Sequence, residues 1–244
     1  MQDYLATVQT HYPSAQTTEK TLNQCLSIIE KNLGLFPPQI ALADSLCCDE
    51  VNSLQFPSHE MLGPFKMGGL GGYPFAGLTG MGAFSHHIPE EGAALLFYGP
   101  HIGISRDGTV GKIKRGGQSE HSGCCGSATG ALARFQDKNI KSTDITSPDY
   151  QQQMIEQLLL EEGDRLKSAD NPVLKTTQIL YEAIDRQIEM LASQTPFPCK
   201  YLINCGGIFI NGDHDAESFW ASKRLEILDL QANERTDMQD DLFK

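Results

Sequence analysis

The sequence predicts a single α/β domain with a central, largely parallel sheet flanked by helices. Short apolar runs alternate along the chain with segments of helical periodicity, which is the order of elements in α/β proteins. The run Ala93 to Tyr98 is apolar at every position, as expected of a strand buried on both faces. A chain of 244 residues with 40% hydrophobic residues can bury one full core, so we assign residues 1–244 to one domain.

The N-terminal half begins with a predicted helix at about residues 17–34. Apolar residues recur there at helical spacing, and Gly34 is placed to end the helix. The next apolar segment, Ile40 to Leu46, is predicted to be a strand or a short buried segment that leads directly into Cys47.

The C-terminal half, at about residues 148–230, is predicted to contain helices and one late strand. Ser147 and Pro148 are suited to the N-cap and the first helical position of one of these helices. Further helices are expected over residues 126–135 and about 173–193, and a strand is expected over Tyr201 to Ile210, interrupted by Gly206 and Gly207. The tail after Leu230 is polar and acidic, and we expect it to be loosely attached.

Glycine is concentrated in the middle of the chain, at about residues 42–135. Between Gly63 and Gly130 lie 18 of the 23 glycines and four of the seven histidines. Because glycine loses more conformational entropy on folding than any other residue, this density needs a structural reason. The backbone either makes many tight turns here or approaches something closely, and we expect the functional site in this region.

Familiar binding motifs do not account for these glycines. Residues 68–72 lack the G-x-G-x-x-G spacing of a dinucleotide loop, and residues 108–112 lack both the spacing and the hydroxyl of a phosphate loop. Residues 103–107 lack the second glycine of a nucleophile elbow, and the chain has no H-E-x-x-H motif.

Composition excludes several classes of function. The formal net charge of −12 argues against nucleic-acid binding, which depends on Lys and Arg to neutralise phosphates. No apolar run approaches the roughly 18 residues that a membrane span needs. The first residues lack the basic and apolar regions of a signal peptide and the Arg-rich character of a transit segment, so a cytoplasmic location is expected.

Cysteine and histidine placement suggests a metal site. Cys47 and Cys48 follow one apolar segment, His101 follows the next, and Cys124 and Cys125 precede a predicted helix. Groups at the carboxyl ends of parallel strands converge on one crevice. Two thiolates and one imidazole suit zinc, and three protein ligands leave the fourth position free for water, as in catalytic sites. Free cysteine is also a common core residue, which is the reading we prefer for Cys25, Cys199 and Cys205.

Six blocks of sequence, in order between about residues 42 and 135, carry a family resemblance. They are Cys47 to Asn52, Met67 to Phe75, Gly77 to Gly80, Ala83 to Pro89, Tyr98 to Gly103 and Ser122 to Ser127. In these blocks the chain resembles the low-CO2-inducible protein B family, whose active members are called theta-class carbonic anhydrases. The resemblance extends more weakly to Tyr201 to Asn211, and it implies a fold like that of the beta carbonic anhydrases.

The resemblance also implies a function and its residues. The function is zinc-dependent, reversible hydration of carbon dioxide to bicarbonate by attack of a zinc-bound hydroxide, in a homodimer. Cys47 and Asp49 match the C-x-D pattern, His101 matches the P-H-x-G block, and Cys125 is favoured over Cys124 as the third ligand. The beta-class motif continues to an arginine, but position 51 is Val. We therefore expect Arg115, with Arg106 as the alternative, to pair with Asp49.

Other interpretations remain open at this stage. The chain could be a catalytically inactive, zinc-binding or assembly member of the family. It could also be a metal-free enzyme with Cys125 as nucleophile, beside His101 or His121. Around the site, His86 and His87 are candidates for a proton shuttle or for a structural role. The aromatic residues Tyr73, Phe75 and Phe84 are candidates for the wall of a substrate pocket or for simple packing.

Overall fold

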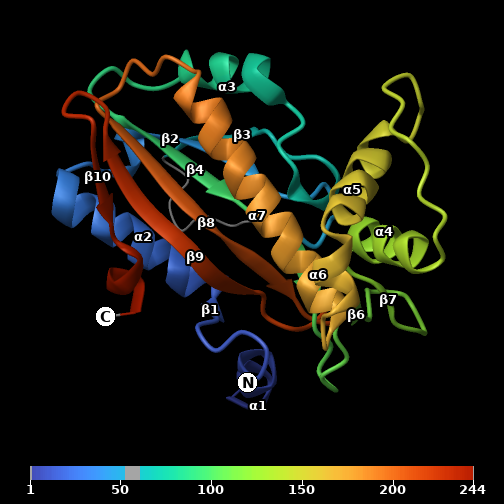
Figure 1. Ribbon diagram of the computed structural model, residues 1–244. Helices are drawn as coiled ribbons and strands as arrows, with labels where there is room; N and C mark the ends of the chain where they lie inside the picture. The colour runs from blue at the N-terminus through green and yellow to red at the C-terminus, as the bar shows by residue number, and fades with distance from the viewer. Residues whose placement is uncertain (1, 53–60, 244) are drawn as a thin grey trace.

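The computed structural model describes residues 2–52 and 61–243, which form a sheet with helices on both faces (Figure 1). The helices are α1 (Gln2–Gln9), α2 (Thr18–Leu33), α3 (Gly77–Ser85), α4 (Gly126–Gln136), α5 (Tyr150–Glu161), α6 (Gly163–Lys167) and α7 (Pro172–Ser193), with 3-10 turns η1 (Pro37–Gln39), η2 (Leu70–Gly72) and η3 (Gln239–Phe243). The strands are β1 (Gln16–Thr17), β2 (Ile40–Ser45), β3 (Leu62–Lys66), β4 (Ala93–Tyr98), β5 (His101–Gly103), β6 (Lys112–Ile113), β7 (Ser122–Gly123), β8 (Tyr201–Asn211), β9 (Phe219–Asp229) and β10 (Glu234–Asp237).

The main sheet has the strand order β1-β9-β8-β4-β2-β3, with β10 paired to β9 and β5 paired to β8. The pairs β3–β2, β2–β4, β4–β8 and β5–β8 are parallel, whereas β1, β8 and β10 each pair with β9 in the antiparallel sense. The predicted single α/β domain with a largely parallel sheet is therefore confirmed. The antiparallel half around β9 was not predicted from the sequence.

The two faces of the sheet explain why the central strands are apolar throughout. On β4, Ala94, Leu96 and Tyr98 face the cluster that includes α7, while Leu95 and Phe97 face the cluster that includes α2. Figure 1 shows α7 crossing one face of the sheet, with α2 behind the other face. Because alternate side chains are covered by a helix on each side, no position of this strand is left to water.

Local signals placed α2, α4 and α7 well, whereas α1, α3 and α6 were not predicted. Helix α2 begins after Thr17, whose side chain accepts a hydrogen bond from the Lys20 backbone, and it ends at Gly34 in the left-handed conformation. Helix α5, however, begins at Tyr150 rather than at Ser147 and Pro148. The Ser147 carbonyl accepts a hydrogen bond from the Tyr150 amide in a turn before the helix, so the helix begins two residues later than predicted.

Two expectations about the C-terminal part were also wrong. Strand β8 runs without interruption through Gly206 and Gly207, and only its register with β9 shifts there. A Cβ on Gly206 would lie 2.7 Å from the Tyr98 ring, and one on Gly207 would lie 2.5 Å from Trp220, so close aromatic packing requires both glycines. The tail is not loosely attached either, because β10 pairs with β9 and Leu242 is 1% exposed.

Strand β8 pairs with β4 and β5 on one side and with β9 on the other, so both of its edges are used inside the sheet. Within residues 2–52 and 61–243, no helix has the length and apolar character needed to cross a membrane.

Candidate metal centre

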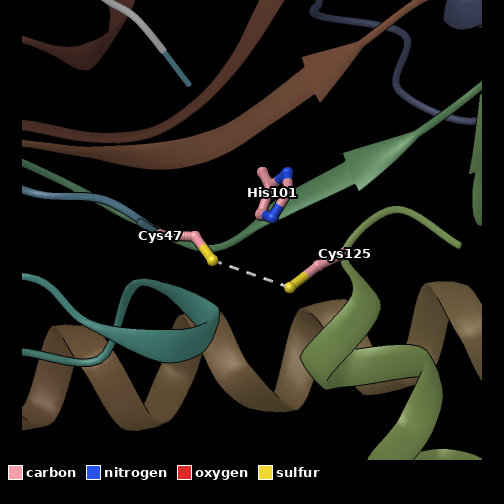
Figure 2. Close-up of side chains that lie close together, drawn as sticks. All are labelled: Cys47, His101 and Cys125. Carbon is pink, nitrogen blue, oxygen red and sulfur yellow. Dashed lines mark hydrogen bonds between the residues drawn. The ribbon is translucent and has the colours of Figure 1, made fainter. Parts of the chain in front are cut away.

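Three separate elements bring Cys47, His101 and Cys125 together. Cys47 lies two residues beyond the end of β2, His101 begins β5 just after β4, and Cys125 is the residue before α4. Strands β2 and β4 are adjacent and parallel, so both chains leave the sheet at the same edge. Figure 2 shows both sulfurs and one ring nitrogen of His101 turned toward a common centre.

The spacing of these atoms fits a metal ion. One ligand atom from each of the three residues lies within 4.8 Å of the others, and all three residues are buried. The Cys47 and Cys125 sulfurs are 3.9 Å apart. Two sulfurs bound to tetrahedral zinc at about 2.3 Å each are about 3.8 Å apart, so the thiols already have the required separation.

The orientation of His101 provides an independent test of the fit. Its Nδ1 lies 2.7 Å from Asn211 Oδ1, inside the protein. Its Nε2 is buried and has no hydrogen-bond partner among the residues that the structure describes. A buried nitrogen without a partner costs free energy unless something binds it, and a metal ion would do so here.

The vicinal cysteines lie on opposite sides of this imidazole. The Cys124 sulfur is 3.6 Å from His101 Nδ1, the nitrogen that faces Asn211. The Cys125 sulfur instead groups with Cys47. Asp49, His101 and Cys124 form a second group of atoms within 4.8 Å, but in that group the Cys124 sulfur lies on the Nδ1 side. An ion bound to Nε2 therefore has Cys125 as its natural sulfur ligand.

The electrostatics of the site favour a cation. A hydrogen bond with Cys125, together with burial, raises the pKa of the Cys47 thiol to about 12 in the absence of an ion. Burial alone would lower the pKa of His101, but the Cys124 and Cys47 sulfurs more than offset it and raise that pKa to about 10. Positive charge is therefore favoured among these sulfurs, whether as a proton or as a metal ion.

Asp49 lies at the edge of the centre and is bound by Arg115. Asp49 Oδ2 is 3.8 Å from His101 Nε2 and accepts a hydrogen bond of 2.8 Å from Arg115 Nη2. Its Oδ1 accepts from the Val51 backbone amide at 3.4 Å. Burial raises the pKa of Asp49, but the side chains of Glu50, His101 and Arg115 together lower it below its ordinary value.

Arg115 reaches this position from the loop between β6 and β7. Its Nη1 donates to Ser122 Oγ at 2.7 Å and to the Gly123 carbonyl at 3.2 Å, and its Nε donates to Glu50 at 2.8 Å. The two hydrogen bonds from Nη1 to Ser122 and Gly123 of β7 hold the guanidinium beside Asp49, although Arg115 is far from the C-x-D block in sequence. Arg106, the alternative, is exposed and pairs with Asp215.

Close approach of backbones explains two glycines next to the candidate centre. A Cβ on Gly68 would lie 2.1 Å from the Leu46 carbonyl oxygen, and one on Gly72 would lie 2.4 Å from the Gly99 carbonyl oxygen. The loop before α3 therefore lies directly against the ends of β2 and β4, where Cys47 and His101 follow. The Cys48 amide donates to the Gly69 carbonyl and the Ser45 hydroxyl to the Gly72 carbonyl, which fixes this contact.

The aromatic candidates separate into different roles. Tyr73 is half-buried and packs against the buried cluster that contains Cys47 and Cys125. Phe75 lies outside it, against Tyr73 and Tyr150. Phe84 is fully buried in the core beneath α7, so it packs the sheet instead.

The remaining histidine and cysteine candidates lie elsewhere. His86 and His87 are exposed at the end of α3, and the His87 ring packs against Phe65 of the outer strand β3. Cys48 is exposed. The other cysteines are buried in the core, as expected: Cys25, Cys199 and Cys205.

Asn211 is the residue of the site that sequence reasoning did not single out. It is the last residue of β8 and is 3% exposed, and it hydrogen-bonds to His101 across 110 positions of sequence. A signal was present, because a polar residue at the carboxyl end of a buried parallel strand faces the crevice where ligands bind.

The fold and the site together define an α/β protein with a candidate thiolate–imidazole metal centre at the carboxyl ends of parallel strands. Residues 16–229 match the family described as limiting CO2-inducible proteins B/C beta carbonic anhydrases. The chain belongs to this family, and the resemblance inferred from the sequence blocks is confirmed. Among curated proteins, no sequence matches the chain.

Solved structures agree with this assignment. PtLCIB4, a homolog of the limiting CO2-inducible protein LCIB, is 29% identical, with a TM-score of 0.82 over 96% of this chain and 98% of that chain. A mutant of PtLCIB4 is 30% identical, with a TM-score of 0.78 over the same shares. LCIB itself is 20% identical, with a TM-score of 0.68 over 93% of this chain and 95% of that one, a likeness of fold.

Proposed function

We propose that this protein catalyses the reversible hydration of carbon dioxide to bicarbonate at a zinc ion held by Cys47, His101 and Cys125. The observation that carries the proposal is the buried group of three ligand atoms within 4.8 Å, beside an aspartate that an arginine holds. Membership of a family described as beta carbonic anhydrases supports the same reaction.

The donor set supports zinc as the metal. Thiolate sulfur is a soft ligand that selects zinc over magnesium or calcium, and imidazole completes a mixed sulfur–nitrogen set. The chemistry that zinc supplies when bound is a nucleophile at neutral pH, because it lowers the pKa of water from 15.7 to about 7. The three side chains leave a fourth position free for this purpose.

Asp49 would accept a hydrogen bond from a group bound at that fourth position. Its Oδ2 lies near His101 Nε2, on the side of the imidazole where the two sulfurs lie. Arg115 binds the same oxygen at 2.8 Å, which keeps the carboxylate ionised and competes with its direct binding to the metal. Asp49 therefore orients the attacking group, and Arg115 is the residue that positions Asp49.

The surroundings of the centre suit an apolar substrate. Cys47 and Cys125 belong to a buried cluster whose other members are mostly aliphatic, with Tyr73 packed at its boundary. Carbon dioxide has no net dipole and enters such surroundings without losing hydrogen bonds. Exclusion of bulk water also strengthens the interaction of Asp49 with the groups around it.

A metal-free cysteine enzyme is less well supported. The nucleophile in such an enzyme is a thiolate, so its cysteine needs a lowered pKa. The Cys125 sulfur, the nucleophile in that interpretation, lies 3.9 Å from the Cys47 sulfur, and the hydrogen bond between them, together with burial, raises the pKa of the Cys47 thiol. The sulfur that lies next to Nδ1 of His101 is that of Cys124, and this nitrogen already contacts Asn211.

Two measurements test the proposal. Elemental analysis of purified protein should find about one zinc per chain, and the Cys47→Ser variant should lose it. Stopped-flow measurement of carbon dioxide hydration should then give a rate far above that of the Cys47→Ser protein. Zinc in the wild type with equal rates for both proteins would identify a catalytically inactive member, and absence of zinc would refute the metal centre.

We also propose that the domain works as a homodimer, on the basis of the family resemblance. Light scattering coupled to size-exclusion chromatography should give twice the chain mass of 26.8 kDa. A single species at the chain mass across the accessible range of concentration would exclude the dimer.

A further inference from the structure

The Nδ1 side of His101 contains two buried groups that the proposed reaction does not use. Asn211 Oδ1 lies 2.7 Å from His101 Nδ1, and the Cys124 sulfur lies 3.6 Å from the same nitrogen. All three side chains are at least 97% buried. Groups of this kind are expensive to bury, so their arrangement calls for an explanation.

The orientation of the Asn211 amide is set by a second contact. Its Nδ2 donates a hydrogen bond of 2.9 Å to the Val51 carbonyl, in the segment that follows Asp49. Turning the amide over would place two carbonyl oxygens against each other at Val51. The oxygen of Asn211 therefore faces His101, and an oxygen acceptor at that position requires the proton to be on Nδ1.

Cys124 supports the same oxygen. Its sulfur lies 3.7 Å from Asn211 Oδ1 and is placed to donate to it. The backbone of Cys124 is held on both sides, because its carbonyl accepts from the Gly103 amide at 2.7 Å and its amide donates to the Gly111 carbonyl at 2.9 Å. The vicinal cysteines thus have different tasks, one on each side of the imidazole.

We propose that Asn211 is a positioning residue of the metal centre, supported by Cys124. Asn211 Oδ1 accepts the Nδ1 proton of His101, so in the neutral imidazole the lone pair is on Nε2, which faces Cys47 and Cys125. The bond also fixes the plane of the ring. This inference rests on the proposed zinc site, and it identifies a residue that controls metal affinity without touching the metal.

The test compares two variants of Asn211 by zinc affinity, measured by competition with a chromophoric chelator. Asn211→Ala removes the acceptor and should weaken zinc binding about 10- to 100-fold, the usual effect of losing such a partner of a metal-binding histidine. Asn211→Asp restores an acceptor oxygen at the same place and should recover part of the lost affinity, because its second oxygen then faces the Val51 carbonyl. Recovery by Asp is not expected if Asn211 only fills space.

A matched control comes from the same strand. Asn204 is also a buried asparagine of β8, at 1% exposed, and it lies within the sheet rather than at its carboxyl end. Asn204→Ala should lower stability in thermal unfolding without changing the zinc affinity of the folded protein. Equal zinc affinity of Asn211→Ala and wild type would overturn the inference, and so would an equal loss in Asn204→Ala.

A spectroscopic readout reports the tautomer directly. Long-range 1H–15N spectra of the zinc-loaded wild type should show His101 protonated at Nδ1 and coordinated through Nε2. The Cys124→Ala variant should keep stoichiometric zinc with a smaller loss of affinity than Asn211→Ala. Coordination through Nδ1 would refute the inference, whereas a wild type that binds no zinc at all would refute the metal centre itself.

Discussion

Replacing Arg115 with alanine gives the most informative test of the site, because it should separate catalysis from metal binding. Arg115 and Asp49 are both largely buried, at 18% and 13% side-chain exposure, and their hydrogen bond is charge-assisted at 2.8 Å. Such a bond contributes about 1.5–3 kcal/mol. The contact to Glu50 adds little, since Glu50 is 71% exposed.

The expected loss of activity follows from this energy. If Asp49 keeps its productive orientation only through the arginine, a loss of 1.5–3 kcal/mol corresponds to roughly a 10- to 150-fold fall in kcat/KM, at about 1.36 kcal/mol per factor of ten. Zinc content should be unchanged, because Arg115 contacts none of the three candidate ligands in the structure. Stopped-flow hydration rates and elemental analysis on the same preparation measure both quantities.

Arg106 provides the control for this experiment. It is an exposed arginine in the segment between β5 and β6, and it pairs with Asp215 at 3.1 Å. The Arg106→Ala variant should therefore leave the hydration rate unchanged. Arg115→Lys should be intermediate, since an ammonium keeps the charge but not the fork of donors. An Arg115→Ala protein that holds zinc and retains the full rate would refute the role assigned to the Asp49–Arg115 pair.

Three further predictions concern the ligands, the tail and a buried charge. Cys125→Ser should lose zinc on dialysis while Cys124→Ser retains it, and the opposite result in elemental analysis would exchange their roles. Leu242→Ala should lower the free energy of unfolding in urea by about 2–5 kcal/mol, because this side chain is 1% exposed; an unchanged midpoint would mean that the tail is not anchored. Burial raises the pKa of Asp44 despite the ion pair with Lys66, so the charged form of Asp44 destabilises the fold above that pKa. In thermal unfolding at pH 7, Asp44→Asn should therefore be more stable than the wild type. This advantage should vanish as the pH falls through the pKa of Asp44.

Much of the fold could be predicted from local patterns. The bounds of α2, α4 and α7 and of strand β4 follow from periodicity, end signals and continuous apolar runs. Strand β9 was missed because its second half mixes charged and apolar residues, such as Arg224 and Glu226 beside Leu225. Those charges are paired in the tertiary structure: Arg224 binds Glu189 and Glu226.

The candidate site was predictable in part. Placement of cysteines and a histidine after apolar runs indicated which chain segments meet, and the family resemblance selected Cys47, His101, Cys125 and Asp49. The structure brings these residues together and places Arg115 beside Asp49. It also adds Asn211, which no motif in the sequence marks.

The candidate zinc centre thus depends on two kinds of information. The sequence by itself determined the cysteine and histidine candidates, the strands that precede them and the glycines that allow close backbone contact. Each of these features follows from the identity of residues that are neighbours in the sequence. Only the tertiary structure shows that Cys125 rather than Cys124 faces Cys47, that Arg115 pairs with Asp49 and that Asn211 hydrogen-bonds to His101. These contacts join residues 78, 66 and 110 positions apart, and contacts over such separations form when the chain folds, so no local sequence pattern predicts them.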